Sequence, residues 1–349
     1  YYNGYGVQQD YIKAKEYFEL AAEKNCSIAF IHLGNLYLYG QCVKQNIHKA
    51  ELNYKLSAKQ NDSYGYLLLG NLYFNILKDI KKAKKYYELA AEMNNSESLY
   101  NLGTFYFNGI DSEPNFEKAK KYMILAAKQN NSLALLDLGT LYFNGIGTQR
   151  NLIEAKKYYE LSAKFDNPMA QFNLGNYYFH GFDGNQNYTK ARDYYELAAK
   201  QNIAMALIKL EYHFIDGFEI DPRFFNTREF FELKRKELDS EVFCNLGCFY
   251  LHQNPYGQNL LKAKYYLELS AKQNNAKAYV HLGIIYRDGI GVLKDINRAI
   301  QYFELAAKQN DHYSFYSLGE IYYRGINVVR DVKRSIGYLE SASNLNNSY

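Results

Sequence analysis

Apolar residues recur along the chain every three or four positions, which is the spacing of one face of an α-helix. Residues 151–164, NLIEAKKYYELSAK, follow this pattern when Ala and Ser are counted with the apolar residues. Residues 132–145, SLALLDLGTLYFNG, are apolar at most positions, so this segment is expected to be buried on most sides. The two segments predict a unit of two helices, which we name helix A (the pattern of 132–145) and helix B (the pattern of 151–164).

The two patterns repeat at a fixed interval along the chain. Helix A carries a Leu-Gly pair whose glycine recurs every 36 residues, except for a step of 33 after Gly70 and a double step of 72 across Glu211. The glycines are Gly34, Gly70, Gly103, Gly139, Gly175, Gly247, Gly283 and Gly319. The matching helix B positions are Ala14, Ala50, Ala83, Ala119, Ala155, Ala191, Thr227, Ala263, Ala299 and Ser335. The pattern predicts nine A helices and ten B helices, with partial repeats at both ends.

The ends of the predicted helices carry residues suited to capping. Asp or Asn stands four residues before the helix B landmark in nine of ten copies, where its side chain can accept hydrogen bonds from the first-turn amides. Asn stands eleven residues after the landmark in eight copies, where a helix can end in the left-handed conformation. Pairs such as Asn108-Gly109 mark the bend between A and B.

Small residues recur where the helices are expected to touch. Helix B carries an Ala-Ala or Ser-Ala pair, such as Ala90-Ala91 and Ser162-Ala163, and helix A carries its glycine. A glycine inside a helix costs roughly 1 kcal/mol relative to alanine, which close helix packing can offset. Because one helical pair cannot bury both of its faces, neighbouring pairs must stack. The sequence therefore predicts an all-α solenoid of about nine to ten two-helix repeats with a period of 36.

These residues resemble a known repeat. The pattern A-x-x-x-L-G-x-x-Y-x-x-G, followed by D-x-x-K-A-x-x-Y-x-x-x-A-A, is similar to the Sel-one-like repeat (SLR), a relative of the tetratricopeptide repeat, and residues 278–310 are a close copy. The resemblance implies a right-handed superhelix that acts as an adaptor for other proteins in quality control, secretion or signalling. A secreted branch of the family, linked to β-lactam binding or hydrolysis, has a disulfide in each repeat. Since this chain lacks those cysteine pairs, we do not expect that activity.

Composition narrows the compartment and the partners. Of the 349 residues, 48% are apolar and 22% charged, and the net charge of +4 is spread without a basic patch, which argues against nucleic acid. Four cysteines are too few and too unevenly placed for a disulfide framework, so we expect free thiols in the cytoplasm. Six Asn-x-Ser/Thr sequons leave the endoplasmic-reticulum lumen as the alternative. No apolar run suggests direct membrane contact within this segment. The chain starts without Met, so we expect it to be part of a longer protein.

One stripe of helix A is polar. Counted from its glycine, polar residues collect at positions −2, +1 and +5, which are three and four residues apart and so share one face. Such a stripe would line the concave side of a solenoid, where we expect a partner protein or an extended peptide to bind. The alternative is a solvated stripe without a partner. The predicted binding residues are His32, Asn35, Asn101, Thr104, Asn108, Asp137, Thr140, Asn144, Asn173, Asn176, His180, Asn245, His252, His281, Asp288, Ser317, Glu320 and Arg324.

One repeat, at about 206–240, departs from the pattern. Glu211 stands in place of the glycine and Thr227 in place of the alanine. One hypothesis is that the superhelix loosens here and exposes a second partner site. The alternative is neutral drift with a locally wider helix spacing. The residues of this possible second site are Phe224, Phe225, Lys234, Arg235 and Lys236.

The sequence offers little catalytic chemistry. Cys244, Cys248 and His252 are spaced by four and could face one metal ion, but Cys244 occupies an apolar slot and a fourth ligand is missing. No Ser/His/Asp or Cys/His set recurs. We therefore expect no metal, no cofactor and no catalytic residues, and interpret the chain as a non-enzymatic scaffold or adaptor. The alternative is the targeting or substrate-binding arm of a larger signalling enzyme such as a protein kinase. The end repeats lack polar caps, so the segment is also expected to self-associate.

Overall fold

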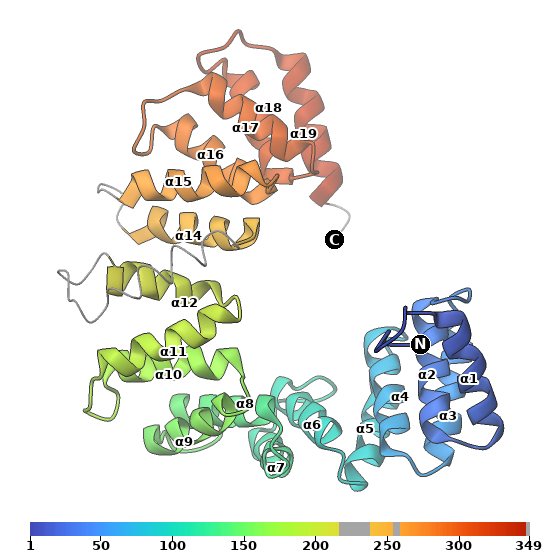
Figure 1. Ribbon diagram of the computed structural model, residues 1–349. Coiled ribbons are helices and arrows are strands. Elements are labelled where there is room, and N and C mark those ends of the chain that lie inside the picture. The colour runs from blue at the N-terminus through green and yellow to red at the C-terminus, as the bar shows by residue number, and fades with distance from the viewer. Residues whose placement is uncertain (216–237, 254–258, 347–349) are drawn as a thin grey trace. The chain divides into compact units, whose positions relative to one another are not determined.

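The computed structural model describes residues 1–215, 238–253 and 259–346, which form eighteen α-helices and one π-helix (Figure 1). They follow the predicted alternation of A and B. The A helices are α2 (Ser27–Tyr39), α4 (Ser63–Asn75), α6 (Ser96–Asn108), α8 (Ser132–Asn144), α10 (Pro168–His180), α12 (Ala204–Lys209), α14 (Ser240–Gln253), α16 (Ala276–Asp288) and α18 (His312–Arg324). The B helices are α1 (Tyr11–Glu23), α3 (Ile47–Lys59), α5 (Ile80–Glu92), α7 (Phe116–Ala127), α9 (Leu152–Ala163), α11 (Tyr188–Lys200), α15 (Asn259–Lys272), α17 (Ile296–Ala307) and α19 (Val332–Asn346). The tenth predicted B helix, around Thr227, lies outside the described residues.

Helices that follow one another in sequence pack side by side. This holds from α1 to α10 and from α14 to α19, and within α2–α9 and α14–α19 the closest packing joins each helix A to the helix B that follows it. The all-α class and the solenoid of paired repeats are confirmed. The chain divides into two compact units, Tyr1–Ala191 and Arg192–Tyr349, which we name unit 1 and unit 2. A single solenoid over residues 1–349 stays a prediction.

The predicted caps are present. The side chains of Asp10, Asn46, Asp79, Asn115, Asn151 and Asp295 accept hydrogen bonds from first-turn amides of their B helices. The left-handed residues that close the B helices are Asn25, Asn61, Asn94, Asn130, Asn202, Asn274 and Asn310, with φ between 59° and 64°. A feature that was not predicted is that the residue after the left-handed one often caps the next helix A. Asn95 and Asn131 do so for α6 and α8. Two adjacent polar residues therefore end one helix and begin the next.

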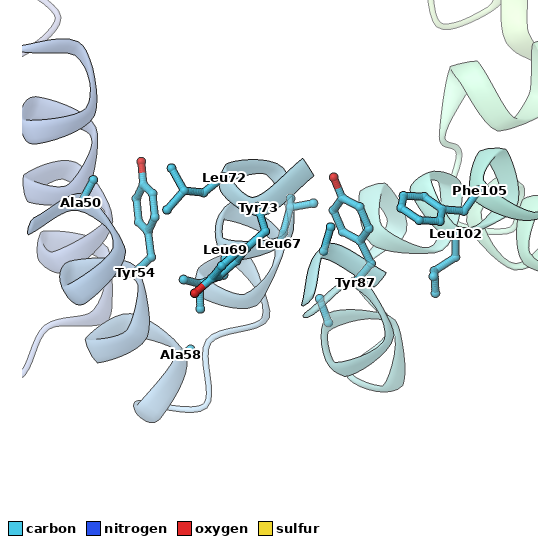
Figure 2. Packing of buried hydrophobic residues seen from close by; sticks show 12 residues of the cluster. Ala50, Tyr54, Ala58, Leu67, Leu69, Leu72, Tyr73, Tyr87, Leu102 and Phe105 are labelled. Carbon is cyan, nitrogen blue, oxygen red and sulfur yellow. The ribbon is translucent and has the colours of Figure 1, made fainter. Parts of the chain in front are cut away.

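An aromatic ring of helix B packs on the glycine of the preceding helix A. A Cβ atom placed on Gly139 would lie 2.6 Å from Cδ1 of Tyr159, and a Cβ on Gly70 would lie 2.5 Å from Cδ1 of Tyr87. Tyr54 of α3 and Tyr87 of α5 stand in the same orientation between their neighbours, with their hydroxyls pointing the same way (Figure 2). The mid-helix glycine is thus explained, because any side chain at this position would collide with the ring.

The degenerate repeat begins with an altered helix A in unit 2. Helix α12 has six residues and continues as a π-helix, η1 (Leu210–Ile215). Glu211, which replaces the repeat glycine, is buried, and its Oε1 accepts a hydrogen bond of 2.6 Å from the Tyr266 hydroxyl of α15. Lys262 Nζ lies 3.4 Å from the same oxygen. Glu211 therefore forms a side-chain contact with α15, which a glycine at this position could not form.

Candidate partner-binding surface

We name the +5 positions of the predicted stripe its outer row. In α6, α8 and α10 this position is the last residue of the helix. In unit 1 these residues are Asn108, Asn144 and His180, all exposed. Each is followed by a glycine in the left-handed conformation, which ends the helix and leaves the side chain at its rim. The same geometry holds in unit 2 for Asp288 and Arg324, which are also exposed. The outer row therefore presents polar groups at a fixed position in each repeat.

We name the +1 positions of the stripe its middle row. Several of these side chains form hydrogen bonds within their own repeat. The Tyr54 hydroxyl donates to Asn35 Oδ1 at 2.7 Å, and the Tyr159 hydroxyl donates to Thr140 Oγ1 at 3.3 Å. Asn71, which was not predicted, accepts from Tyr87 in the same way at 2.8 Å. These polar side chains are half-buried. The hydrogen bonds from the tyrosine hydroxyls restrict the orientation of these three side chains.

A cavity of about 310 Å³ opens in the stripe between α6 and α8. Four predicted residues line it, namely Thr104, Asn108, Asp137 and Thr140. The other residues lining it are Tyr100, Phe107, Met123, Leu141 and Ile146. The structure thus brings polar stripe residues from two neighbouring repeats of unit 1 to one concave site with apolar walls.

Asp137 supplies the charge in this cavity. The side chain is half-buried, and its Oδ2 accepts a hydrogen bond of 3.1 Å from the Tyr100 hydroxyl of the preceding repeat. Burial raises the pKa of Asp137 above its ordinary value, and the hydrogen bond from Tyr100 opposes that rise only in part. Among the described residues, no basic side chain forms an ion pair with this carboxylate. The cavity therefore holds an acidic group without a cationic neighbour.

The cavity exists where the aromatic pattern of helix B is interrupted. The residue that packs on the repeat glycine is Tyr54, Tyr87 and Tyr159 in α3, α5 and α9, but Met123 in α7. Met123 still contacts Gly103, since a Cβ there would lie 2.8 Å from its Cγ. It has no ring and no hydroxyl to place beside Thr104, whose Oγ1 instead donates to the backbone of Asn101 at 2.8 Å. The missing ring leaves the space that the cavity occupies.

Sequence reasoning missed Tyr100 and Met123 as members of the site. Tyr100 stands at position −3 from its glycine, outside the predicted polar stripe. Met123 stands on helix B, also outside the predicted stripe. The available signal was a methionine where the neighbouring repeats have a tyrosine.

The remaining stripe residues of unit 1 differ in accessibility. Asn101, Asn173 and Asn176 are half-buried on α6 and α10. His32 is covered instead: its ring stacks on Phe18 with centroids 4.5 Å apart and lies 5.1 Å from the ring of Tyr2. Burial lowers the pKa of His32, which favours the neutral imidazole. This histidine is better explained as part of the aromatic packing at the first repeat than as an open contact.

In unit 2, the stripe contains charged residues and a thiol. Asn245 and His252 are exposed and His281 is half-buried, whereas Ser317 is only 1% exposed and does not reach the surface. Arg324 pairs with Glu320 at 2.7 Å. The pKa of Asp288 is lowered mainly by its hydrogen bonds with Arg287. The hydrogen bond with the Cys244 thiol, and after it the one with His281, lowers the pKa of Cys248, so Cys248 is the thiol of this pair that ionises first.

Three further sequence predictions concern a metal site, a membrane span and a second partner site. Among the described residues, no three His, Cys, Asp or Glu side chains are grouped so that they could hold a metal ion, Cys244, Cys248 and His252 included. Over the same residues, every helix is too short or too polar to span a bilayer. The possible second site formed by Phe224, Phe225, Lys234, Arg235 and Lys236 lies outside the described residues.

The sequence profile of the Sel1 (Sel-one-like) repeat family matches the chain nine times. The matched residues are 1–26, 31–62, 63–95, 96–131, 132–164, 168–203, 244–275, 276–311 and 315–347. The matches cover most of both units. The largest unmatched stretch, between residues 203 and 244, contains the degenerate repeat.

Solved structures share this fold. A protective antigen present in uropathogenic Escherichia coli strains, which displays an SLR fold, is 28% identical with a TM-score of 0.58, over 98% of this chain and 74% of that one. A Sel1 repeat protein from Oxalobacter formigenes is 24% identical with a TM-score of 0.50, over 84% of this chain and 86% of that one. No match was found among curated proteins.

Proposed function

The chain belongs to the Sel1 repeat family, and from this premise we propose that it is a non-enzymatic scaffold that binds another protein or an extended peptide along the polar stripe of its A helices. The observation that carries the proposal is the stripe of α6, α8 and α10. There, polar residues recur in the same register on successive helices and the cavity beside Asp137 opens among them. If the stripe were only solvated and had no partner, there would be no reason for stripe residues to line a cavity.

The chemistry of the stripe suits a peptide. Side-chain amides such as those of Asn101, Asn144 and Asn173 both donate and accept hydrogen bonds, so they can pair with a peptide backbone in either direction. Because Asn35 and Thr140 are held by tyrosine hydroxyls, less conformational entropy is lost when a partner is bound. The stripe is therefore arranged before a partner arrives, which favours recognition of an extended segment.

A capture experiment with two matched variants tests the proposal. The stripe variant carries Asn101→Ala, Asn108→Ala, Asn144→Ala and Asn173→Ala. The control variant carries Lys85→Ala, Lys121→Ala and Lys157→Ala, which are exposed positions on α5, α7 and α9. Wild-type chain and both variants are immobilised and exposed to native lysate, and bound proteins are quantified by mass spectrometry after circular dichroism has shown equal helicity.

We expect proteins that are recovered on wild type and on the control variant but are depleted on the stripe variant. Equal recovery on all three baits would overturn the assignment of the binding surface to the A helices. Selective loss on the lysine variant would instead place the partner on the B helices.

The proposed compartment is the cytoplasm, and the support for it is the small number and uneven spacing of the cysteines. The competing location, the endoplasmic-reticulum lumen, would expose the Asn-x-Ser/Thr sequons to glycosylation. A mobility shift on treatment of the native protein with an endoglycosidase would decide for the lumen.

A further inference from the structure

We propose that the cavity between α6 and α8 is an anchor site for a lysine side chain of the bound partner, whose ammonium group pairs with Asp137. This inference rests on the proposed scaffold function and adds the chemistry of one contact. The site arises from Met123, which stands where the neighbouring helices α5 and α9 carry a tyrosine.

The walls of the cavity fit the two parts of a lysine side chain. Phe107, Met123, Leu141 and Ile146 offer an apolar surface to the four methylene groups. Asp137, Thr104 and Asn108 offer oxygen acceptors to the three N–H donors of the ammonium group. A volume of about 310 Å³ is at the lower end of the range for ligand sites, roughly 300–1,000 Å³, and is therefore suited to one side chain.

Charge complementarity decides the class of ligand. Asp137 is half-buried and, among the described residues, no Lys, Arg or His pairs with it. The Tyr100 hydroxyl donates to Oδ2, so Oδ1 is the oxygen that we expect a cation to contact. An anionic or purely apolar side chain would leave the carboxylate buried without a counter-charge, which is costly. A cation with an aliphatic stem satisfies both the charge and the walls.

The repeat itself supplies a variant that closes the site. Tyr54, Tyr87 and Tyr159 each cover a glycine and place the hydroxyl beside the residue that follows it. Met123→Tyr should therefore cover Gly103 and place a hydroxyl beside Thr104, filling the cavity with a side chain that this fold already accommodates in three repeats. The variant removes the space without removing the carboxylate.

The test uses n-pentylammonium as a lysine side-chain mimic, with 1-pentanol and pentanoate as neutral and anionic analogues. The full chain is labelled at methionine and isoleucine methyl groups, so that Met123 and Ile146 report from the cavity while Met93, Met169 and Met205 serve as references elsewhere. Methyl resonances are followed by NMR during titration. Wild type, Asp137→Asn, Met123→Tyr and the matched control Asp193→Asn, at an exposed position outside the stripe, are compared.

We expect pentylammonium to shift the Met123 and Ile146 resonances saturably in wild type and Asp193→Asn. Asp137→Asn should raise its Kd by about tenfold or more, to the value of 1-pentanol, and this corresponds to about 1.4 kcal/mol of lost binding free energy. In Met123→Tyr, Ile146 should no longer respond to any of the three probes. Equal binding of pentylammonium and pentanol to wild type, no response of the two cavity methyls, or an unchanged Kd in Asp137→Asn would each overturn the proposal.

Capture from lysate with Met123→Tyr separates this inference from the scaffold function. Partners that are lost from the stripe variant and also from Met123→Tyr support both. Partners that are lost from the stripe variant but retained by Met123→Tyr would leave the scaffold function standing and overturn the lysine anchor. Should Met123→Tyr fail to fold, Asp137→Asn carries the same comparison.

Discussion

The hydroxyl of Tyr54 donates a hydrogen bond of 2.7 Å to Oδ1 of Asn35, linking a helix B to the polar stripe of the helix A before it. The Tyr54 ring is 1% exposed and covers Gly34, so the same residue fills the core and orients a surface amide. In several repeats, the same tyrosine therefore both packs in the core and orients a polar side chain of the stripe.

Tyr54→Phe should therefore lower the free energy of unfolding by about 1 kcal/mol, the usual net value of such a hydrogen bond. Urea denaturation followed by circular dichroism measures the effect. Tyr17→Phe is the control, because Tyr17 is 59% exposed and its substitution should change stability by less than about 0.5 kcal/mol. If Tyr54→Phe and Asn35→Ala were fully additive in a double-mutant cycle, the hydrogen bond would contribute nothing.

The mid-helix glycines are predicted to be required by their tyrosines. In Gly139→Ala, the new Cβ would lie 2.6 Å from Cδ1 of the buried Tyr159. Overpacking costs about 1–3 kcal/mol, and the better helix propensity of alanine returns about 1 kcal/mol, so net destabilisation is expected. Gly337→Ala on α19 is the matched control, since no atom lies within 4 Å of the added methyl group. It should gain up to about 1 kcal/mol. Equal effects of the two substitutions in urea denaturation would contradict the packing argument.

The repeat architecture could be predicted from the sequence because it depends on local rules that recur in every copy. The Leu-Gly pair, the helix B alanine and the capping Asp and Asn residues act within a few positions of one another, and their repetition averages out single exceptions. The double role of pairs such as Asn94-Asn95, which end one helix and begin the next, was only half predicted. The first residue is recognised by its tolerance of positive φ, whereas the second depends on where the next helix begins.

The cavity could not be predicted from the stripe pattern. It depends on Met123, which stands between two B helices that carry tyrosine at the same position, and on Tyr100, which reaches Asp137 from a different repeat. Periodicity places Asp137 on the correct face of its helix, but it does not show that a neighbouring ring is missing. Similarly, the buried position of Ser317 and the aromatic cover over His32 depend on adjacent elements rather than on spacing within helix A.

Asp137→Asn should raise thermal stability at neutral pH, and the gain should disappear in acid. In the folded wild type, burial raises the pKa of Asp137 above that of the unfolded chain, so the folded state binds its proton more tightly. Stability therefore falls as the pH rises from the unfolded value of about 3.9 through the folded value, and it stays lower above that window. The Asn side chain does not titrate and can still accept from the Tyr100 hydroxyl.

Thermal midpoints of wild type and variant at a series of pH values check this sign. Asp288→Asn is the opposing control, because the hydrogen bonds with Arg287 lower the pKa of Asp288. Its carboxylate contributes stability that is present above the ordinary pKa and is lost as the pH falls through the folded value. A loss of stability in Asp137→Asn that is present at neutral pH and disappears in acid would show that a cation already compensates the carboxylate.

Glu211 distinguishes the two explanations of the degenerate repeat. If Glu211 were neutral drift accommodated by a locally wider helix spacing, restoring the repeat glycine would leave stability unchanged or improve it. The structure instead places Glu211 at 5% exposure, with hydrogen-bond contacts from Tyr266 at 2.6 Å and Lys262 at 3.4 Å on α15. We therefore expect Glu211→Gly to lower the free energy of unfolding by about 2 kcal/mol, as for loss of a hydrogen bond to a charged group.

Glu211→Gln is the matched variant, because it keeps an acceptor for the Tyr266 hydroxyl and removes only the charge. It should therefore lose less stability than Glu211→Gly in urea denaturation. Hydrogen exchange of peptides covering 204–214 and 259–272 locates the effect. In Glu211→Gly both peptides should exchange faster than in wild type, because they form the two sides of one contact. Faster exchange in 204–214 alone would mean that Glu211 acts only within its own helix, and unchanged exchange in both would support drift.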